Sequence, residues 1–127
     1  MNIAVLGGSN GGFATAADLA LAGHRVRLWG RSASALGPLA GDPTLTLTAE
    51  GRQGTARLER ATTDIADALD GAVMVIAPLP ATSHEDLAKR LAPHVNERQI
   101  VLLTPGTLGS YAMARDLARA GDRKSVV

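Results

Sequence analysis

The chain has 127 residues, the size of one domain, and 46% of them are hydrophobic while 20% are charged, as in globular proteins. The 13 basic and 12 acidic side chains leave a net charge of +1, so we expect neither nucleic acid nor a membrane surface as a partner. The chain has no cysteine, which excludes disulfides, thiolate catalysis and cysteine-ligated zinc. It also has no apolar run of about 18 residues and no signal-peptide pattern, so we expect a cytoplasmic location.

The first third of the chain has a strand–helix–strand pattern. An apolar run from Ile3 to Leu6 predicts a buried strand, and an alanine-rich helix follows over 13–22. Ala14, Ala17 and Leu21 recur at helical spacing, which predicts that they form the buried face of this helix. Residues 25–29 alternate between polar and apolar and predict a second strand.

The same alternation returns in the second half. We predict a short helix over 64–69, a strand over 73–77, a helix over 82–91, a strand over 99–103 and a helix over 110–120. Thr82 and Glu85 have the spacing of a capping box at the start of the third of these elements. Strands separated by helices imply a parallel sheet with right-handed crossovers.

The middle and the end of the chain are less regular. Residues 44–48 alternate with period two, and 55–58 can return as their partner, which predicts a β-hairpin. The glycine- and proline-rich segment 32–43 is the loosest part of the chain, and no helix or strand is predicted there. Residues 125–127 resemble the first residues of another strand, so we expect this chain to be the first part of a longer protein, truncated in its last strand.

A glycine-rich loop between the first strand and the first helix carries the sharpest functional signal. In a G-x-G-x-x-G alignment, Gly7 permits the tight turn and Gly12 permits close helix packing, while Ser9 takes the second position, where backbone approaches a pyrophosphate. The Ser9 side chain narrows that approach, although its hydroxyl can donate to a phosphate oxygen. The predicted contacts with the cofactor are Gly7, Gly8, Ser9, Asn10, Gly11, Gly12 and Phe13. The alternative is a turn that only packs a helix on a sheet.

The end of the second strand bears on the choice of cofactor. An NAD site usually has a carboxylate there to bind the ribose hydroxyls, but this chain continues with Gly30, Arg31 and Ser32. We expect Gly30 to leave space, and Arg31 and Ser32 to bind a 2′-phosphate, which favours NADP over NAD with NAD still possible. The alternative is that Arg31 is a solvated loop arginine.

Two further loops follow predicted strands, at the sheet edge where ligands bind in α/β folds. One is residues 77–80, with Ala77, Pro78 and Leu79 as predicted contacts, and the other is residues 104–107, with Thr104 and Pro105 as predicted contacts. We expect both to wall the ribose and nicotinamide, with ordinary turn chemistry as the alternative.

The residues offer little catalytic or metal-binding chemistry. His84 could face the nicotinamide, but a lone histidine there is more often a surface residue, so no catalytic residue is assigned. No histidine and carboxylate grouping has the spacing of a metal site, and no serine has a nucleophile-elbow context.

Three stretches resemble the N-terminal domain of the opine (octopine/nopaline) dehydrogenase family. They are residues 3–12, residues 18–24 and residues 99–106, and the apolar strand ending in Ala77-Pro78 and followed by His84 is also similar. The resemblance covers nearly the whole chain, with departures at Ser9 and Ser110, where the family usually has glycine. It implies a Rossmann-type, doubly wound parallel sheet of about five to six strands with the hairpin in its middle.

The resemblance also implies an activity. Opine dehydrogenases join an amino acid to an α-keto acid reductively with NAD(P)H, which places this chain among oxidoreductases that act on CH–NH groups. The family's catalytic histidine and aspartate lie in a helical C-terminal domain that these residues do not contain. We therefore expect residues 1–127 to bind cofactor weakly without turnover, completed by that missing domain or by self-association into a homo-oligomer.

Two other interpretations stay open. One is a stand-alone NADP-binding module without catalysis. The other is a different reductase, of the ketopantoate or glycerol-3-phosphate type. Residues 28–31 look like the corresponding stretch of bacterial glycerol-3-phosphate dehydrogenases, but that family carries a lysine after the fifth strand, where this chain has Thr104-Pro105-Gly106.

Overall fold

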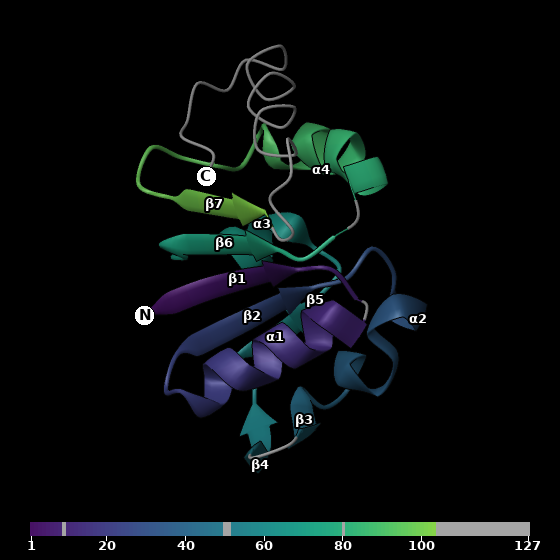
Figure 1. The fold of residues 1–127 in the computed structure, drawn as a ribbon. Helices are drawn as coiled ribbons and strands as arrows, with labels where there is room; N and C mark the ends of the chain where they lie inside the picture. Colours follow the sequence, from purple (N-terminus) through teal and green to yellow (C-terminus); the bar gives the residue numbers. More distant parts are fainter. Residues whose placement is uncertain (9, 50–51, 80, 104–127) are drawn as a thin grey trace.

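The computed structural model describes residues 1–8, 10–49, 52–79 and 81–103 (Figure 1). The strands are β1 (Asn2–Leu6), β2 (Arg25–Trp29), β3 (Thr44–Ala49), β4 (Arg52–Arg57), β5 (Arg60–Thr62), β6 (Met74–Ala77) and β7 (Ile100–Leu103). The α-helices are α1 (Asn10–Leu21), α2 (Ala33–Leu36), α3 (Ile65–Leu69) and α4 (His84–Leu91), with 3-10 turns η1 (Gly37–Ala40) and η2 (Ala81–Ser83). The predicted helix over 110–120 and the strand from Ser125 lie outside the described residues. None of the described helices is long and apolar enough to cross a membrane.

Five parallel strands form the main sheet in the order β5-β2-β1-β6-β7. The chain moves outward from β1 to β2 and later restarts on the other side of β1 with β6, so the strand order reverses between β1 and β6. Ligands of open α/β sheets bind at the carboxyl ends of strands beside such a reversal. In Figure 1 the arrowheads of the sheet point toward the side of the molecule where α2 lies. The predicted Rossmann-type fold is confirmed.

Both faces of this sheet are covered, each by its own hydrophobic cluster. In β1, Ile3 and Val5 face the cluster under α1 and α2, whereas Ala4 and Leu6 face the cluster under α3 and α4. All four side chains are at most 3% exposed. This two-sided burial explains why the strand is apolar at every position rather than at every second one.

Helix α1 begins at Asn10, three residues before the predicted start, and its buried face differs from the predicted one. Ala17 is buried as expected, but Ala14 is exposed and Leu21 is 43% exposed. Leu21 instead approaches Gly54 of β4, where an added Cβ would lie 3.1 Å from its side chain. The face was mispredicted because α1 also packs against the hairpin, a partner that its own periodicity does not reveal.

The hairpin is confirmed, with β3 and β4 paired antiparallel from Thr44 opposite Arg57 to Ala49 opposite Arg52. Within the segment 32–43, for which no element was predicted, residues 33–40 form α2 and η1. Ser32 starts α2, because its hydroxyl accepts a hydrogen bond from the Ala35 amide at 3.2 Å. Strand β5 was not predicted, and with three residues it is too short to show a period of its own.

The start of α3 agrees with the sequence, whereas the start of α4 does not. Asp64 accepts a hydrogen bond from the Ala66 amide at 3.0 Å and caps α3. Helix α4 begins at His84 after η2, and in the described structure the Ser83 side chain at its N-cap makes no capping hydrogen bond. The predicted Thr82–Glu85 capping box was therefore wrong, because η2 carries Thr82 one position away from the cap.

Candidate functional site

The glycine loop turns sharply out of β1 and is tied to the neighbouring strand. Gly7 has φ = 136°, a conformation that side chains disfavour, and its amide donates to the Trp29 carbonyl at 2.8 Å. A Cβ added at Gly12 would collide with the carbonyl oxygen of Gly7. The first turn of α1 therefore packs directly on the strand end, as predicted for the first and third glycines of the motif.

Two other glycines allow α2 to close over the ends of β1 and β2. An added Cβ would lie 2.9 Å from the Ala35 carbonyl oxygen at Gly8 and 2.7 Å from the Leu36 side chain at Gly30. The sequence predicted that Gly30 leaves space for cofactor, but the buried side chain of Leu36 occupies that space. Gly30 therefore allows Leu36 of α2 to pack against the end of β2, and it does not leave space for the cofactor.

A pocket of about 140 Å³ opens beside the glycine loop. It is bounded by the ends of β1 and β2, by α2, by the segment after β6 and by the first turn of α4. Its lining residues are Gly7, Gly8, Trp29, Arg31, Ala35, Leu79, Ser83, Asp86 and Leu87. The position of the pocket, at the carboxyl ends of strands next to the reversal of strand order, is where this type of sheet binds ligands.

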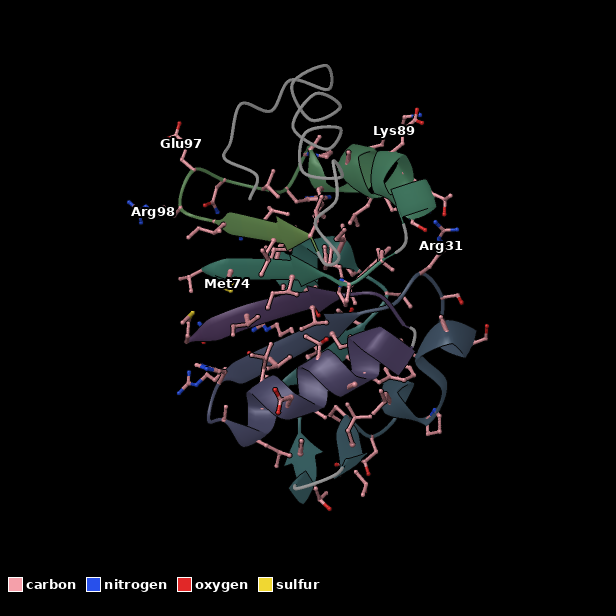
Figure 2. The ribbon with its side chains drawn as sticks, viewed as in Figure 1. Arg31, Met74, Lys89, Glu97 and Arg98 are labelled. Carbon is pink, nitrogen blue, oxygen red and sulfur yellow. The ribbon has the colours of Figure 1, made fainter. Side chains whose placement is uncertain are left out.

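Charged side chains from the segment after β2 and from α4 meet at this pocket. The Oδ2 atom of Asp86 accepts hydrogen bonds from Arg31 Nη2 at 2.7 Å and from Arg90 Nε at 2.9 Å. Figure 2 shows Arg31 at the end of the molecule below α4. The Arg90 guanidinium also lies 5.7 Å from the centroid of the Trp29 ring, within cation–π range.

The two arginines set the ionisation of the carboxyl group between them. The hydrogen bond from Arg90, together with the positive charges of Arg90 and Arg31, lowers the pKa of Asp86 and outweighs the opposing effect of desolvation. Asp86 is therefore ionised throughout the neutral range. Arg31, which lines the pocket, and Arg90, which lies over the Trp29 ring, thus share one carboxylate.

The structure brings together four of the predicted contact residues, Gly7, Gly8, Arg31 and Leu79, which all line the pocket. Gly11 is exposed in the first turn of α1, and its carbonyl accepts a hydrogen bond from the Thr15 hydroxyl at 2.7 Å.

Other predicted contacts are used differently or lie outside the described residues. Phe13 packs against the cluster under α1, and Ala77 is fully buried in the opposite cluster. Ser32 caps α2, and Pro78 is half-buried. Asn10 and His84 are the first residues of α1 and α4. The structure does not describe Ser9, Thr104 and Pro105, so these stay predictions.

Sequence reasoning missed Asp86, which is charged and borders the pocket. Its position was the available signal, since it stands in the first turn of a helix that follows a strand-end loop. Dinucleotide sites usually carry their carboxylate at the end of the second strand, and Asp86 stands on another element. Its pairing with Arg31, 55 positions away in the chain, is a product of the fold.

Comparison with known proteins places this arrangement in a family. Residues 2–113 match the family described as NAD-dependent glycerol-3-phosphate dehydrogenase N-terminus. The chain is 34% identical to an opine dehydrogenase of Arthrobacter sp. (strain 1C) over 91% of its own length and 32% of that protein. It is 31% identical to a glycerol-3-phosphate dehydrogenase [NAD(P)+] of Thioalkalivibrio sulfidiphilus over 79% of its length and 30% of that protein. The chain thus spans about a third of these relatives.

Solved structures with the same fold include an octopine dehydrogenase and a yersinopine dehydrogenase. An octopine dehydrogenase with NADH and L-arginine superposes with a TM-score of 0.80 at 24% identity, over 99% of this chain and 34% of that chain. A yersinopine dehydrogenase with bound NADP+ superposes with a TM-score of 0.77 at 19% identity, over 99% of this chain and 34% of that chain. The predicted resemblance to opine dehydrogenases is confirmed, and the chain belongs to the family of NAD-dependent glycerol-3-phosphate dehydrogenase N-terminal domains.

Proposed function

We propose that this chain is the cofactor-binding part of an opine-type oxidoreductase, which reductively joins an amino acid to an α-keto acid. The adenosine half of NAD(P)H would occupy the pocket between β2 and α4, with its pyrophosphate on the glycine loop. The observation that carries the proposal is the adjacency of the two features, because Gly7 and Gly8 belong to both the loop and the pocket wall.

The residues present suit each part of such a ligand. The backbone amides and the helix dipole at the N-terminus of α1 favour a diphosphate, and close packing at Gly12 brings this end of the helix up to the strand end. The side chains of Trp29, Leu79 and Leu87 give the pocket apolar walls that suit an adenine ring.

Arg31 supports a preference for NADP. Its side chain is 62% exposed at the pocket, so it can reach a 2′-phosphate and form charge-assisted hydrogen bonds with it. Residues 29–32, at the end of β2, include no carboxylate that would repel the phosphate. The fold accommodates both cofactors, since one structural neighbour carries NADH and another carries NADP+.

The chemistry of the whole enzyme needs more than these residues. The nicotinamide, when bound, supplies a hydride to the substrate, and the protein supplies position and electrostatics. We propose that general acid–base groups come from a further domain, and that residues 1–127 bind cofactor without turnover in the cytoplasm. The coverage of about a third of each relative supports this division of labour.

A second candidate is oxidation of glycerol 3-phosphate, which the matching family favours by its description. Resemblance to glycerol-3-phosphate dehydrogenases would require a lysine after the predicted fifth strand. This chain has Thr104-Pro105-Gly106 at that point of the sequence, which favours the opine reaction. Assays of a full-length version with glycerol 3-phosphate, and with pairs of amino acid and α-keto acid, separate the two. A stand-alone module would bind cofactor and support neither reaction.

The cofactor site can be tested on the 127-residue chain by titration with NADPH and NADH, followed through the fluorescence of Trp29, the only tryptophan in the sequence. In a Ser83→Phe variant, a bulky ring projects from the pocket wall, and Ser83 makes no capping bond that would be lost in the described structure. We expect Ser83→Phe to weaken both cofactors by at least about tenfold, because the ring takes the space of the adenine.

Thr82→Phe is the matched control for this experiment. Thr82 is the preceding residue in the same 3-10 turn, but it is exposed and does not border the pocket. Binding should survive this change. Saturable binding that Thr82→Phe and Ser83→Phe weaken equally would place the cofactor elsewhere, and absence of binding to wild type would reject the proposed function for this chain.

A further inference from the structure

The carboxylate that an NAD site usually carries at the end of the second strand has a counterpart on a different element. Asp86 projects from the first turn of α4 and reaches Arg31, which follows β2, at 2.7 Å. Among the described residues that line the pocket, Asp86 is the only acidic one. The pocket therefore holds both an arginine that suits a 2′-phosphate and a carboxylate that suits a ribose hydroxyl.

We propose that Asp86 sets the choice between NADPH and NADH by competing with the 2′-phosphate for Arg31. This inference rests on the proposed cofactor function, because it assumes that the adenosine half occupies the pocket. A 2′-phosphate that pairs with Arg31 must replace Asp86 as the arginine's partner and then lie near a second negative charge. The 2′-hydroxyl of NADH instead can donate a hydrogen bond to the Asp86 carboxylate.

The ion pair is suited to such an exchange. The Arg31 side chain is 62% exposed and that of Asp86 is 47% exposed, so solvent screens their attraction and little is lost when the partners separate. A bound phosphate carries more charge than a carboxylate and forms bidentate bonds with a guanidinium. The fold thus opposes NADPH modestly through Asp86 without preventing its binding.

Arg90 increases the effect of Asp86. It donates to the same Oδ2 atom at 2.9 Å, and its stacking distance to Trp29 keeps it beside the pocket. One carboxylate therefore occupies two guanidinium groups. When Asp86 is made neutral, Arg31 becomes available to a phosphate with Arg90 adding positive charge nearby, whereas the hydroxyl of NADH loses a charged acceptor.

The test compares dissociation constants of NADPH and NADH for wild type, Asp86→Asn and Glu85→Gln. Glu85 is the matched control because it stands next to Asp86 on α4 but pairs with Lys89 at 3.6 Å and does not border the pocket. We expect Asp86→Asn to shift the ratio of the two affinities about fivefold toward NADPH, the size of an exposed ion pair. Glu85→Gln should shift it by less than about twofold, since solvent screens the removed charge.

A second pair of ligands locates the effect at the phosphate. Adenosine 2′,5′-bisphosphate and AMP differ only in the 2′-phosphate, so Asp86→Asn should favour the former by about the same factor as it favours NADPH. Adding Arg31→Met to Asp86→Asn should remove most of this gain, because the freed arginine is its source.

The outcomes separate the inference from the function on which it rests. The role of Asp86 would be overturned if Asp86→Asn and Glu85→Gln shifted the affinity ratio equally, or if Asp86→Asn did not shift it at all. If Ser83→Phe still weakened the binding of both cofactors, the cofactor site itself would stand. A wild type that binds neither cofactor nor either adenosine phosphate would reject the cofactor site and the inference together.

Discussion

Two arginines that lie four residues apart in sequence, Arg27 within β2 and Arg31 just after it, differ in burial and in the partners around them. Arg27 lies on the face of the sheet that α3 covers, and its side chain is 19% exposed. Arg31 follows the strand at the pocket, and its side chain is 62% exposed. The first arginine holds elements of the fold together, whereas the second is available to a ligand.

The partners of Arg27 explain its structural role. Its Nε donates to Glu59 Oε2 at 2.9 Å, and its Nη1 donates to the backbone carbonyl of Asp67 at 2.7 Å and to the Asp67 carboxylate at 3.3 Å. The hydrogen bond with Glu59 and the charges of Glu59, Asp67 and Asp70 raise the pKa of Arg27 despite its partial desolvation. The Arg27 guanidinium thus joins β2 to the residue before β5, Glu59, and to α3 and the residue after it, Asp67 and Asp70.

The two arginines differ in how much stability the fold would lose without them. Loss of Arg27 would leave the Asp67 carbonyl and the Glu59 carboxylate without this donor in a partly desolvated place, which is unfavourable, and the Asp67 carboxylate would keep Arg60. Loss of Arg31 would leave Asp86 in contact with Arg90 and with water. A fold can therefore position one arginine for stability and reserve another for binding by burial alone.

Arg27→Met should show the largest effect. We expect it to lower the free energy of unfolding by about 2 kcal/mol, because a partly buried charge network loses its centre. Urea denaturation measures this. Arg60→Met is the matched control, since Arg60 also pairs with Asp67, at 2.8 Å, but is 56% exposed, and its loss should cost less than about 0.5 kcal/mol. Equal losses would contradict the assigned difference between buried and exposed pairs.

Arg31→Met should leave stability nearly unchanged and affect binding instead. We expect NADPH to bind about fivefold more weakly, with NADH changed by less than about twofold, because only the 2′-phosphate needs the guanidinium. Fluorescence titration gives both constants. Arg98→Met is the control, because Arg98 lies on the opposite side of the molecule (Figure 2). An identical loss of both cofactors in Arg31→Met would remove the assignment of this arginine to the phosphate.

The smallest effect is the pH dependence of the ion pairs that the two arginines form. The pKa of Asp86 is lowered in the folded chain, so its ion pairs add stability above its unfolded pKa, and this contribution disappears as pH falls through the folded value. The pKa of Arg27 is raised above its ordinary, strongly basic value, so its contribution is present throughout the neutral range and is lost only as pH rises through the folded value. Thermal unfolding of wild type and Asp86→Asn should differ at pH 7 and converge in strong acid. A constant difference across that range would show that Asp86 acts by packing rather than by charge.

Local patterns were sufficient for most of the framework. The strand over 25–29 was predicted with the bounds that the structure has, and the glycine spacing identified Gly7 and Gly12 correctly as turn and packing positions. Such features depend on neighbours within a few residues, because a buried strand needs continuous apolar residues and a tight turn needs glycine.

Features that depend on distant segments were missed. The exposed Ala14 and the hairpin contact of Leu21 follow from how α1 meets β4, and the filling of space at Gly30 follows from the placement of Leu36. Strand β5 has three residues and is held by pairing with β2. None of these can be read from the period of a single segment.

The sequence by itself determined the alternation of strands and helices, the turn after β1 and the presence of Arg31 without a neighbouring carboxylate. Only the tertiary structure decided which groups Arg31 would meet, because parallel strands with long crossovers bring residues 55 positions apart to one edge of the sheet. Chain composition specifies the charges, and the topology specifies their distances, on which electrostatic energies depend.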